Sequence, residues 1–414
     1  MEGREPLPPV RVLWNDAAMR VSIFTREYPP SIYGGAGVHV AQLVPQLRKF
    51  IDVDVQCMGE PREGATAHAE NFPPNANAAL RTFGADLSMV AAMPDVDVVH
   101  SHTWYANLGG HLAGLFHDIP HITSAHSLEP QRPWKREQLG GGYALSSWAE
   151  RTAYDGADAV IAVSKGQRAD VLSCYPELDP DKVHVVLNGI DPEDFKPDHG
   201  TDVLQQIGMD PDKPSVVFVG RITRQKGLIH LVRAAQYLDP GTQLILLAGA
   251  PDTPEIAAEF NEAFAAVEQQ RGGGVVWVQE MLPRASVRQV MSHATVFACP
   301  SIYEPLGIVN LEAMATETAV VASAVGGIPE VVVDNETGFL VPYDPAQASD
   351  PQFVSGFEHN FAEKINELTR DPARAEAFGK AGRRRCIDEF SWEKIARQTI
   401  EVYQTAIERH ASAS

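Results

Sequence analysis

From Arg20 onward, short apolar runs rich in β-branched residues alternate with longer segments in which apolar residues recur at helical spacing. The first series predicts strands at 20–25, 52–57, 97–102, 121–126, 159–163 and 183–187, with a helix at 38–49 after the first strand. The second series predicts strands at 215–219, 243–248, 275–279, 295–299 and 319–322. From about residue 351 the pattern is helical, and a last helix is expected at 391–409.

Strands that alternate with helices at this spacing form βαβ units and therefore parallel sheets. The two series are separated by a stretch from Asn188 to Pro214 that is rich in Asp, Pro and Gly. We therefore expect an α/β protein of two doubly wound, Rossmann-like domains, with this stretch as a candidate hinge. Ligands of such sheets bind beyond the carboxyl ends of the strands, so the chemistry is expected in a deep cleft between the domains.

Composition and charge limit the partners. The chain has 414 residues, of which 44% are hydrophobic and 21% charged, as is typical of a globular protein with a sizeable core. Because 34 Lys and Arg stand against 54 Asp and Glu, the formal net charge is −20. We expect neither nucleic acid nor membrane as a partner, since both need a basic surface. A small phosphorylated substrate needs only a local group of cations. The oligomeric state is left open, a homodimer included.

The N-terminus and the cysteines favour a cytoplasmic protein. Residues 1–18 are rich in Pro and mixed charge and lack the apolar stretch of a signal peptide, so we expect a disordered extension. No apolar run approaches the roughly 20 residues that span a bilayer. The four cysteines lie far apart and are expected as reduced thiols: Cys57, Cys174, Cys299 and Cys386.

The first candidate binding element is the glycine turn Gly34-Gly35, between the strand at 20–25 and the helix that follows. Glycines allow close approach of the backbone, and a helix N-terminus offers free N–H groups to an anion. The turn does not fit the GxGxxG dinucleotide pattern, because His39 and Val40 occupy the positions after Gly37. By itself it is also compatible with a tight turn that binds nothing.

The second candidate element holds Arg221 and Lys226, again between a strand and a helix. Arg makes forked hydrogen bonds and Lys adds a point charge, so the pair suits a diphosphate. A helix dipole disfavours cations at its N-terminus unless an anion is bound there. This favours a binding role for Arg221 and Lys226 over the alternative that they are only solvated charges at the start of a helix.

The third element follows the strand at 295–299 and opens a helix. Glu304 is expected in the loop and Glu312 within the helix, where a carboxylate can hold sugar or ribose hydroxyls. The alternative is that the helix dipole simply favours an acid at this end of the helix, which would explain Glu304 by itself. It does not explain the presence of both acids together with a glycine in the turn. Backbone N–H groups expected near phosphate are those of Leu306, Gly307, Ile308 and Val309.

The fourth element begins with His126 and Ser127 at the end of a predicted strand. A lone His at a strand end is more often structural than catalytic. The basic residues Arg132, Lys135 and Arg136 come directly after it in a very acidic chain. They predict a second phosphate site, with a solvated charged loop as an equal alternative.

No metal site is predicted. The pairs Asp52/Asp54 and Asp95/Asp97 resemble DxD motifs, but they lie at the amino ends of strands, away from the ligand side of a parallel sheet. The pair His100/His102 has suitable ligand types without a third histidine or carboxylate at metal-ligand spacing.

Together these residues resemble the retaining glycosyltransferases of family 4, which have the GT-B fold. The pattern of Arg221 and Lys226 followed by Glu304 and Glu312 is typical of that family, and the resemblance runs from Met19 to about His410. The subgroup similarity is to bacterial glycogen-synthase-type enzymes that use ADP-glucose, through Glu27-Tyr28-Pro29-Pro30, Gly34-Gly35, His126-Ser127-Leu128 and Gly326-Gly327-Ile328-Pro329-Glu330.

Two features depart from the enzymes that elongate glucan. Those enzymes have His-Asp-Trp where this chain has His102-Thr103-Trp104. The segment 127–143 is instead similar to the α-maltose-1-phosphate synthases, which transfer glucose from ADP-glucose to α-glucose 1-phosphate. A basic loop suits a phosphorylated acceptor better than neutral glycogen. The acceptor site is accordingly expected to contain Thr103, Ser127, Arg132, Lys135, Arg136 and Tyr143.

The resemblance also implies roles and boundaries. Glu312 is expected to bind ribose, Glu304 the transferred glucose, and His126 to line the sugar pocket. Configuration is retained, and neither a metal nor another cofactor is required. The expected domains are 19–190, to which the C-terminal helix at 391–414 returns, and 191–390.

Three other functions stay open. A glycogen synthase would share the donor site and differ only in the acceptor loop. A sugar-nucleotide epimerase on the same fold would need no acceptor, and a sensor would bind the nucleotide sugar without turnover. The sequence does not distinguish ADP from UDP, because backbone and apolar contacts usually hold the base.

Overall fold

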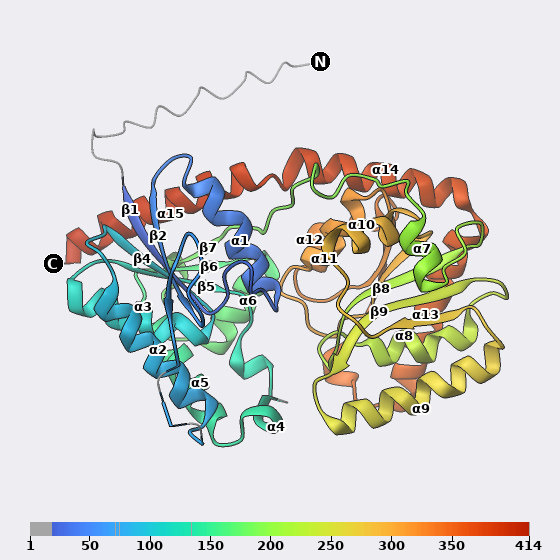
Figure 1. The fold of residues 1–414 in the computed structure, drawn as a ribbon, viewed down its shortest axis with the longest axis horizontal. Coiled ribbons are helices and arrows are strands. Elements are labelled where there is room, and N and C mark those ends of the chain that lie inside the picture. The colour runs from blue at the N-terminus through green and yellow to red at the C-terminus, as the bar shows by residue number, and fades with distance from the viewer. Residues whose placement is uncertain (1–18, 71, 74, 134, 414) are drawn as a thin grey trace, which may run out of the picture.

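The computed structural model describes residues 19–70, 72–73, 75–133 and 135–413, so the extension expected at 1–18 lies outside the described residues. Two parallel β-sheets with their helices form two lobes side by side (Figure 1). This confirms the expectation of two doubly wound α/β units.

Within the described residues, the first sheet has seven strands in the order β3-β2-β1-β4-β5-β6-β7. Its central strand, β1, pairs through Val21 with Val53 on one side and Val98 on the other. Because side chains alternate across a strand, Val21 and Ile23 pack in the core on one face of the sheet. Phe24 packs in the core on the opposite face. The strands are β1 (Arg20–Thr25), β2 (Asp52–Met58), β3 (Thr66–His68), β4 (Val98–His102), β5 (His121–Ala125), β6 (Ala159–Ala162) and β7 (Val183–Val185).

Helices follow most strands of the first sheet, as βαβ units require. They are α1 (Gly35–Leu47), α2 (Ala78–Ala92), α3 (Trp104–His117), α4 (Lys135–Leu139), α5 (Gly142–Gly156) and α6 (Lys165–Cys174), with 3₁₀ turns at Glu129–Gln131 and Pro180–Lys182. Helix α1 packs its apolar side, including Leu43 and Leu47, on the sheet. Helices α1, α3 and α6 directly follow strands and therefore begin at the carboxyl edge of the sheet, where ligands of such folds bind.

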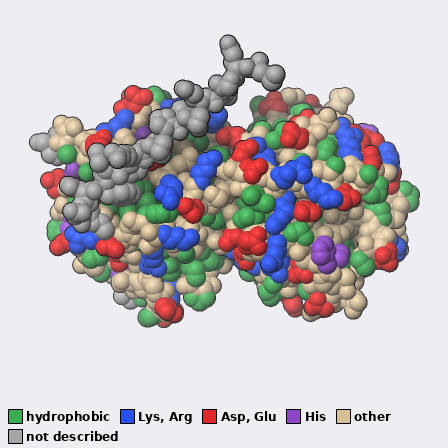
Figure 2. All heavy atoms as spheres, turned by 90° about the horizontal axis from the view of Figure 1, so that it is seen from above, with side chains coloured by type: hydrophobic (Ala, Val, Ile, Leu, Met, Phe, Trp, Pro, Cys, Tyr) green, Lys and Arg blue, Asp and Glu red, His purple; other side chains and the backbone are tan. Residues whose placement is uncertain are grey.

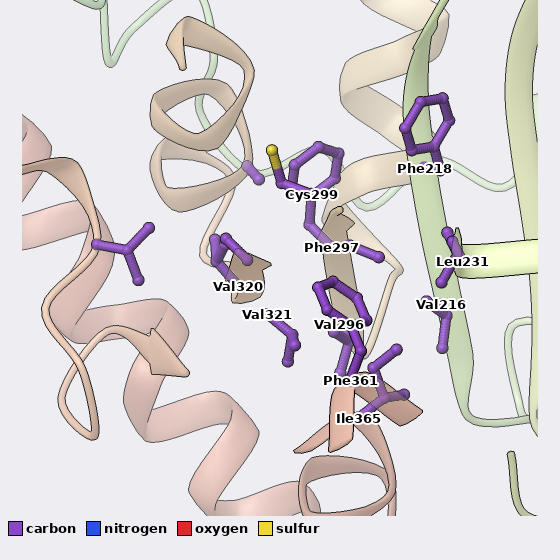
Figure 3. Packing of buried hydrophobic residues seen from close by; sticks show 14 of the residues in the cluster. Val216, Phe218, Leu231, Val296, Phe297, Cys299, Val320, Val321, Phe361 and Ile365 are labelled. Carbon is purple, nitrogen blue, oxygen red and sulfur yellow. The ribbon is translucent and has the colours of Figure 1, made fainter. Parts of the chain in front are cut away.

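In the part of the chain that the structure describes, the second sheet has six strands in the order β10-β9-β8-β11-β12-β13. Figure 3 shows its core, in which Val216 and Phe218 of β8 meet Phe297 of β11 and Phe361 of a covering helix. Val217 lies between them in sequence and packs on the opposite face of the sheet. The strands are β8 (Ser215–Ile222), β9 (Gln243–Pro251), β10 (Val275–Val278), β11 (Val296–Cys299), β12 (Ala319–Ser323) and β13 (Gly338–Val341).

The helices of the second lobe cover both faces of this core. They are α7 (Asp202–Ile207), α8 (Leu228–Ala234), α9 (Pro254–Arg271), α10 (Arg284–Ser292), α11 (Ile308–Ala315), α12 (Ile328–Val331), α13 (Pro351–Arg370) and α14 (Pro372–Glu389), with 3₁₀ turns at Ala235–Tyr237 and Pro345–Gln347. Helix α7 lies in the stretch expected as a linker, so that stretch is partly helical.

The last helix, α15 (Trp392–Ala413), returns from the second lobe to the first (Figure 1). Its apolar side joins the core under β1 and α1 through Trp392, Ile395 and Ile400. The hydroxyl of the buried Tyr403 lies 2.8 Å from His100 Nδ1 in β4. The two lobes are therefore joined twice along the chain, once through residues 188–214 and once through α15.

All eleven predicted strands are present, with ends that differ by at most three residues. Strands β3 and β13 were not predicted. Both are short strands at the edge of a sheet, and β3 has the sequence Thr-Ala-His, without the apolar run on which the prediction depended. Strand β3 pairs with β2. Strand β13, which pairs with β12, is apolar but has only four residues, Gly-Phe-Leu-Val.

Acidic and basic side chains are interspersed over the face in Figure 2, without a continuous basic surface there. Among the described helices, none is both long enough and apolar enough to cross a membrane.

Candidate active site

The carboxyl edges of the two sheets face each other, as contacts between loops of the two lobes show. Ser164, at the start of α6, donates a hydrogen bond to the carbonyl of Pro305 at 2.6 Å. Leu128 N–H donates to the hydroxyl of Tyr303 at 3.2 Å. Leu128 lies two residues after His126, and Tyr303 directly precedes Glu304. This bond therefore brings the His126 segment of the first lobe beside the Glu304 loop of the second.

The glycine turn is held by a carboxylate from its own lobe. Glu27 accepts hydrogen bonds from the N–H groups of Tyr33, at 2.6 Å, and Gly34, at 2.8 Å. Gly34 is the N-cap of α1, and the first bond within the helix runs from Val38 to its carbonyl. The following amides, beginning at Gly35, therefore belong to the first helical turn, whose N–H groups have no partner within the helix. A Cβ built on Gly35 would meet no atom within 4 Å, so the approach to this turn is open.

Arg221 reaches from the second lobe to the glycine turn of the first. Its Nη1 lies 3.3 Å from the hydroxyl of Tyr33, and its guanidinium lies 5.0 Å from the centre of that ring. The same nitrogen is 3.3 Å from Asp252 Oδ1, which fixes the guanidinium at the end of β8. Arg221 and the Gly34–Gly35 turn thus lie on opposite walls of one site.

Lys226 lies in the turn before α8, and its Nζ is 2.7 Å from Glu304 Oε2. Burial is the largest single influence and acts to lower the pKa of this ammonium, but the interactions with Glu304 and Cys299 together raise the pKa. Gly227 follows with φ +60°, and a Cβ there would collide with the carbonyl of Pro300. Only glycine allows the turn to press against the Glu304 loop. Lys226 therefore enters the site as a fixed, charged ammonium.

The Glu304 loop is shaped by glycines that have positive φ. Gly307 has φ +96° and caps α11, so the amides of Ile308 and Val309 begin the helix. Gly326 has φ +53°, and a Cβ there would collide with the Glu304 carbonyl. That carbonyl accepts a hydrogen bond from Gly327 at 3.0 Å. Two of the glycines expected from sequence therefore hold the Glu304 backbone in place.

Glu312, in the middle of α11, is largely buried, and its Oε1 lies 3.6 Å from Arg284 Nη2. Burial raises the pKa of Glu312 to about 7, although Arg284 partly opposes the shift. Arg284 opens α10, also pairs with Asp194 at 3.4 Å, and lies over the ring of Phe195. Sequence reasoning missed Arg284, because its position in the chain carries no motif and only the fold places it beside Glu312.

His126 lies in a group of three histidines. His126 Nε2 is 2.9 Å from His102 Nδ1, and its ring centre is 4.7 Å from that of His39 in α1. Burial lowers the pKa of all three imidazoles, that of His39 to about 4, so they are uncharged at neutral pH. The spacing along the sequence showed no third ligand beside His100 and His102, but α1 and the end of β5 bring His39 and His126 close to His102 in the fold.

The basic segment after His126 lies partly in contact with its own lobe. Arg132 Nη1 donates to Ser127 Oγ at 3.0 Å. The Lys135 side chain is only 7% exposed, with Nζ 4.0 Å from Glu129 Oε1 and 5.4 Å from the ring centre of Tyr105. The exposed Arg136 lies over the ring of Tyr143. Arg132 and Arg136 are thus better placed than Lys135 to meet a ligand in solution.

Beneath this segment lie two buried carboxyl groups that the sequence did not single out for a role. Glu129 accepts from Ser146 Oγ at 2.6 Å, and its own N–H donates to Glu150 Oε1 at 2.8 Å. Burial, followed by the charge of Glu129, raises the pKa of Glu150 to about 8. Tyr143 donates from its hydroxyl to the Glu129 carbonyl at 2.7 Å. This network holds the basic segment on α5 and explains the position of Tyr143.

Thr103 has an unusual backbone, with φ +66° and ψ 163° directly before α3. A β-branched residue is strained in this region. Such strain is often found where a protein presents a group to a ligand. Thr103 follows His102 at the carboxyl end of β4, beside the histidine group.

Two family models match consecutive parts of the chain. "Glycosyltransferase Family 4" matches residues 33–194, and "Glycosyl transferases group 1" matches residues 201–385. The boundary between them falls in the stretch that joins the two sheets.

Curated relatives extend over nearly the whole chain. An "Alpha-maltose-1-phosphate synthase" of Mycolicibacterium smegmatis is 60% identical over 392 residues, covering 93% of this chain and 99% of the relative. A protein of the same name from Mycobacterium tuberculosis H37Rv is 56% identical over 390 residues, with the same coverage.

Solved structures share the fold at low sequence identity. Sucrose-phosphate synthase of Thermosynechococcus elongatus has a TM-score of 0.75 at 24% identity, covering 94% of this chain and 99% of that one. The catalytic domain of starch synthase IV of Arabidopsis thaliana has a TM-score of 0.68 at 18% identity, covering 95% and 100%. These similarities confirm the GT-B arrangement of the two lobes. The family models and the curated relatives show that the chain belongs to glycosyltransferase family 4, in the group that contains the α-maltose-1-phosphate synthases.

Proposed function

We propose that the protein transfers glucose from ADP-glucose to α-glucose 1-phosphate and releases α-maltose 1-phosphate and ADP. The name of relatives that are 56–60% identical supports this product. The observation that carries the proposal is the contact between Leu128 and Tyr303, which sets a segment with Arg132 and Arg136 against the loop of Glu304. An anionic acceptor and a nucleotide-sugar donor would meet at that contact.

On the donor side, the diphosphate lies between Arg221, Lys226 and the first turns of α1 and α11. Negative charge grows on the β-phosphate as the bond between C1 and the phosphate oxygen breaks. Cations and helix N-termini that are fixed in advance stabilise that charge without reorganisation. The Lys226 ammonium is already held at 2.7 Å from Glu304. In this proposal these groups act in place of a metal ion, and no other cofactor takes part.

Glu312 binds the ribose hydroxyls, and Glu304 binds hydroxyls of the transferred glucose. A carboxylate accepts two such hydrogen bonds in its ionised form. Arg284 stands behind Glu312 and favours that form. His126 lines the pocket around C1, where its carbonyl or neutral ring faces the developing positive charge of the sugar.

On the acceptor side, Arg132 and Arg136 bind the phosphate of glucose 1-phosphate by forked, charge-assisted hydrogen bonds. The 4-hydroxyl oxygen of the acceptor forms the new bond to C1 on the face that the phosphate leaves, so configuration is retained. The electron pair of the broken bond stays on the β-phosphate of ADP, which takes up the hydroxyl proton. Thr103, Ser127 and Tyr143 line the acceptor side of this pocket.

The test is a set of mass-resolved incubations with ADP-glucose and either glucose 1-phosphate or glycogen. We expect a disaccharide phosphate with glucose 1-phosphate and no elongation of glycogen. Arg132→Gln and Arg136→Gln should each raise the KM for glucose 1-phosphate by about tenfold, the value of roughly one charge-assisted hydrogen bond. Arg397→Gln, which changes a surface arginine on α15 paired with Glu393, is the matched control and should leave KM unchanged.

Elongation of glycogen with no disaccharide phosphate would contradict the acceptor assignment and indicate a glycogen synthase. If ADP-glucose were only hydrolysed, and glucose were transferred neither to glucose 1-phosphate nor to glycogen, the transferase proposal itself would be contradicted.

A further inference from the structure

The three histidines near the sugar pocket come from three separate elements. His39 lies in α1, His102 ends β4, and His126 follows β5. Their ring centres are 4.7, 5.2 and 5.5 Å apart. One ring nitrogen of each lies within 4.8 Å of the others. The proposed transfer reaction uses His126 alone and gives no role to the other two.

Three imidazoles around one ion are a common zinc site. Zinc binds histidine at about 2.0–2.1 Å in tetrahedral geometry, which places the ligating nitrogens about 3.4 Å apart. The pair His102 and His126 is already closer than this, at 2.9 Å. The ligating nitrogens that are farthest apart lie within 4.8 Å of each other and need to approach by about 1.4 Å at most.

The partners of His39 favour this use of its ring. Its Nδ1 lies 2.6 Å from Asn188 Oδ1, an amide oxygen that can only accept a hydrogen bond. Nδ1 therefore carries the proton, and Nε2 presents a lone pair. Among the described residues, none gives a hydrogen bond to Nε2, although that atom is buried. A polar atom that accepts from the other ring nitrogen is the usual second contact of a metal-binding histidine.

We propose that His39, His102 and His126 bind one divalent transition-metal ion of the zinc class. His39 ligates through Nε2, His102 through Nδ1 and His126 through Nε2. The proton now shared between His102 and His126 moves to the other nitrogen of its own ring, so all three ligands are neutral. The fourth position of the ion faces the cleft, because His126 is only partly buried.

The ion is an inhibitor and not a cofactor. This consequence rests on the proposed function, since a metal on His126 occupies the place of the glucose C1. The alternative is a group of hydrogen-bonded imidazoles that shapes the pocket and binds no ion. The two alternatives predict different results when metal is added: these three rings bind the ion in the first and do not bind it in the second.

The first experiment uses the full chain, freed of metal by a chelator, and titrates it with Co²⁺ as a spectroscopic probe. We expect one equivalent to bind with the intense visible bands of a four-coordinate site. His39→Gln should weaken binding at least about tenfold, as loss of a ligand or its support does. His111→Gln, in α3 outside the group, is the matched control and should change it less than twofold. No four-coordinate spectrum, or an unchanged affinity in His39→Gln, would overturn the proposal.

A second measurement uses the wild-type protein, so its result does not depend on whether a variant folds. X-ray absorption of the wild-type protein with one equivalent of Zn²⁺ should show three imidazoles around the ion, and a shell of oxygen alone would refute the site. In the transfer assay, Zn²⁺ should lower the rate and a chelator should restore it. Binding without inhibition would overturn the inhibitory role. Absence of any transfer reaction would count against the proposed function while the spectra still decide the metal site.

Discussion

At the scale of single residues, the raised pKa of Glu312 leads us to expect that binding of the proposed donor depends on pH. Burial raises this pKa to about 7, whereas an unfolded Glu titrates near 4.3. In the free protein, Glu312 is therefore largely protonated below pH 7 and ionised above it. Ribose hydroxyls are held best by the ionised form, so binding below pH 7 must also release a proton.

We therefore expect the Kd for ADP-glucose to fall as pH rises toward 7 and to level off above it. The diphosphate of ADP-glucose carries no proton near neutrality, so the ligand does not add a titration of its own. Glu312→Gln should weaken binding at pH 8 and remove the dependence around pH 7, as calorimetry can measure. Glu393→Gln on α15 is the control. A pH dependence retained in Glu312→Gln would assign the titration to another group.

The folded state should lose stability over the same pH range. Because the folded pKa of Glu312 lies above its unfolded value, the native state holds the proton more tightly. This contribution is complete below about pH 4.3 and is lost as pH rises through about 7. The melting temperature should fall less steeply between pH 5 and pH 7 in Glu312→Gln than in the wild type. Equal slopes would show that another group dominates.

Thr103 stores backbone strain directly after β4, beside the histidine group. Its φ of +66° is rare for a β-branched residue and costs of order 1–3 kcal/mol. Thr103→Gly should therefore raise the free energy of unfolding by about 1 kcal/mol after the entropy cost of glycine. Thr123→Gly, in the regular strand β5, is the control and should lower stability. Denaturant melts measure both, and a loss in Thr103→Gly would show that the threonine side chain outweighs the strain.

At the scale of elements, α15 is part of the core of the lobe to which it returns. Tyr403 is fully buried and its hydroxyl contacts His100, so Tyr403→Ala should cost about 3–5 kcal/mol. Glu401→Ala, on the exposed side of the same helix, should change stability by less than about 0.5 kcal/mol. Deletion of 392–414 should remove native packing, seen as a loss of near-ultraviolet circular dichroism. An unchanged melting temperature on deletion would contradict this role for α15.

At the scale of the whole molecule, Glu330 joins the lobes through the N-terminus of α6. Its carboxylate accepts from Lys165 N–H at 3.0 Å and Gly166 N–H at 2.9 Å. Glu330→Ala should loosen this contact, increase the radius of gyration in X-ray scattering and lower kcat/KM by about tenfold. Glu336→Ala, exposed in a turn of the same lobe, is the control. An unchanged radius of gyration would show that other contacts suffice to hold the lobes.

The sequence by itself determined the layered plan of the molecule and singled out the residues proposed to bind the donor. Apolar periodicity located eleven strands, because a buried parallel strand needs a run of β-branched residues wherever it lies. Arg221, Lys226, Glu304 and Glu312 were found because their spacing from strand ends is local. The short edge strand β3 escaped because its pairing, and not its composition, makes it a strand. Strand β13, Gly-Phe-Leu-Val, is apolar but only four residues long.

Only the tertiary structure decided which of these residues meet. Arg284 beside Glu312, and Tyr303 on Leu128, join positions far apart in the chain. His39 and His126 reach His102 only through the order of β1, β4 and β5 in the sheet. The burial that shifts the pKa of Glu312 and the histidines is likewise a property of packing. The local sequence pattern predicts helices and strands because these depend on residues that are close together in the chain. A site depends on where the ends of those helices and strands lie in space, which only the tertiary structure decides.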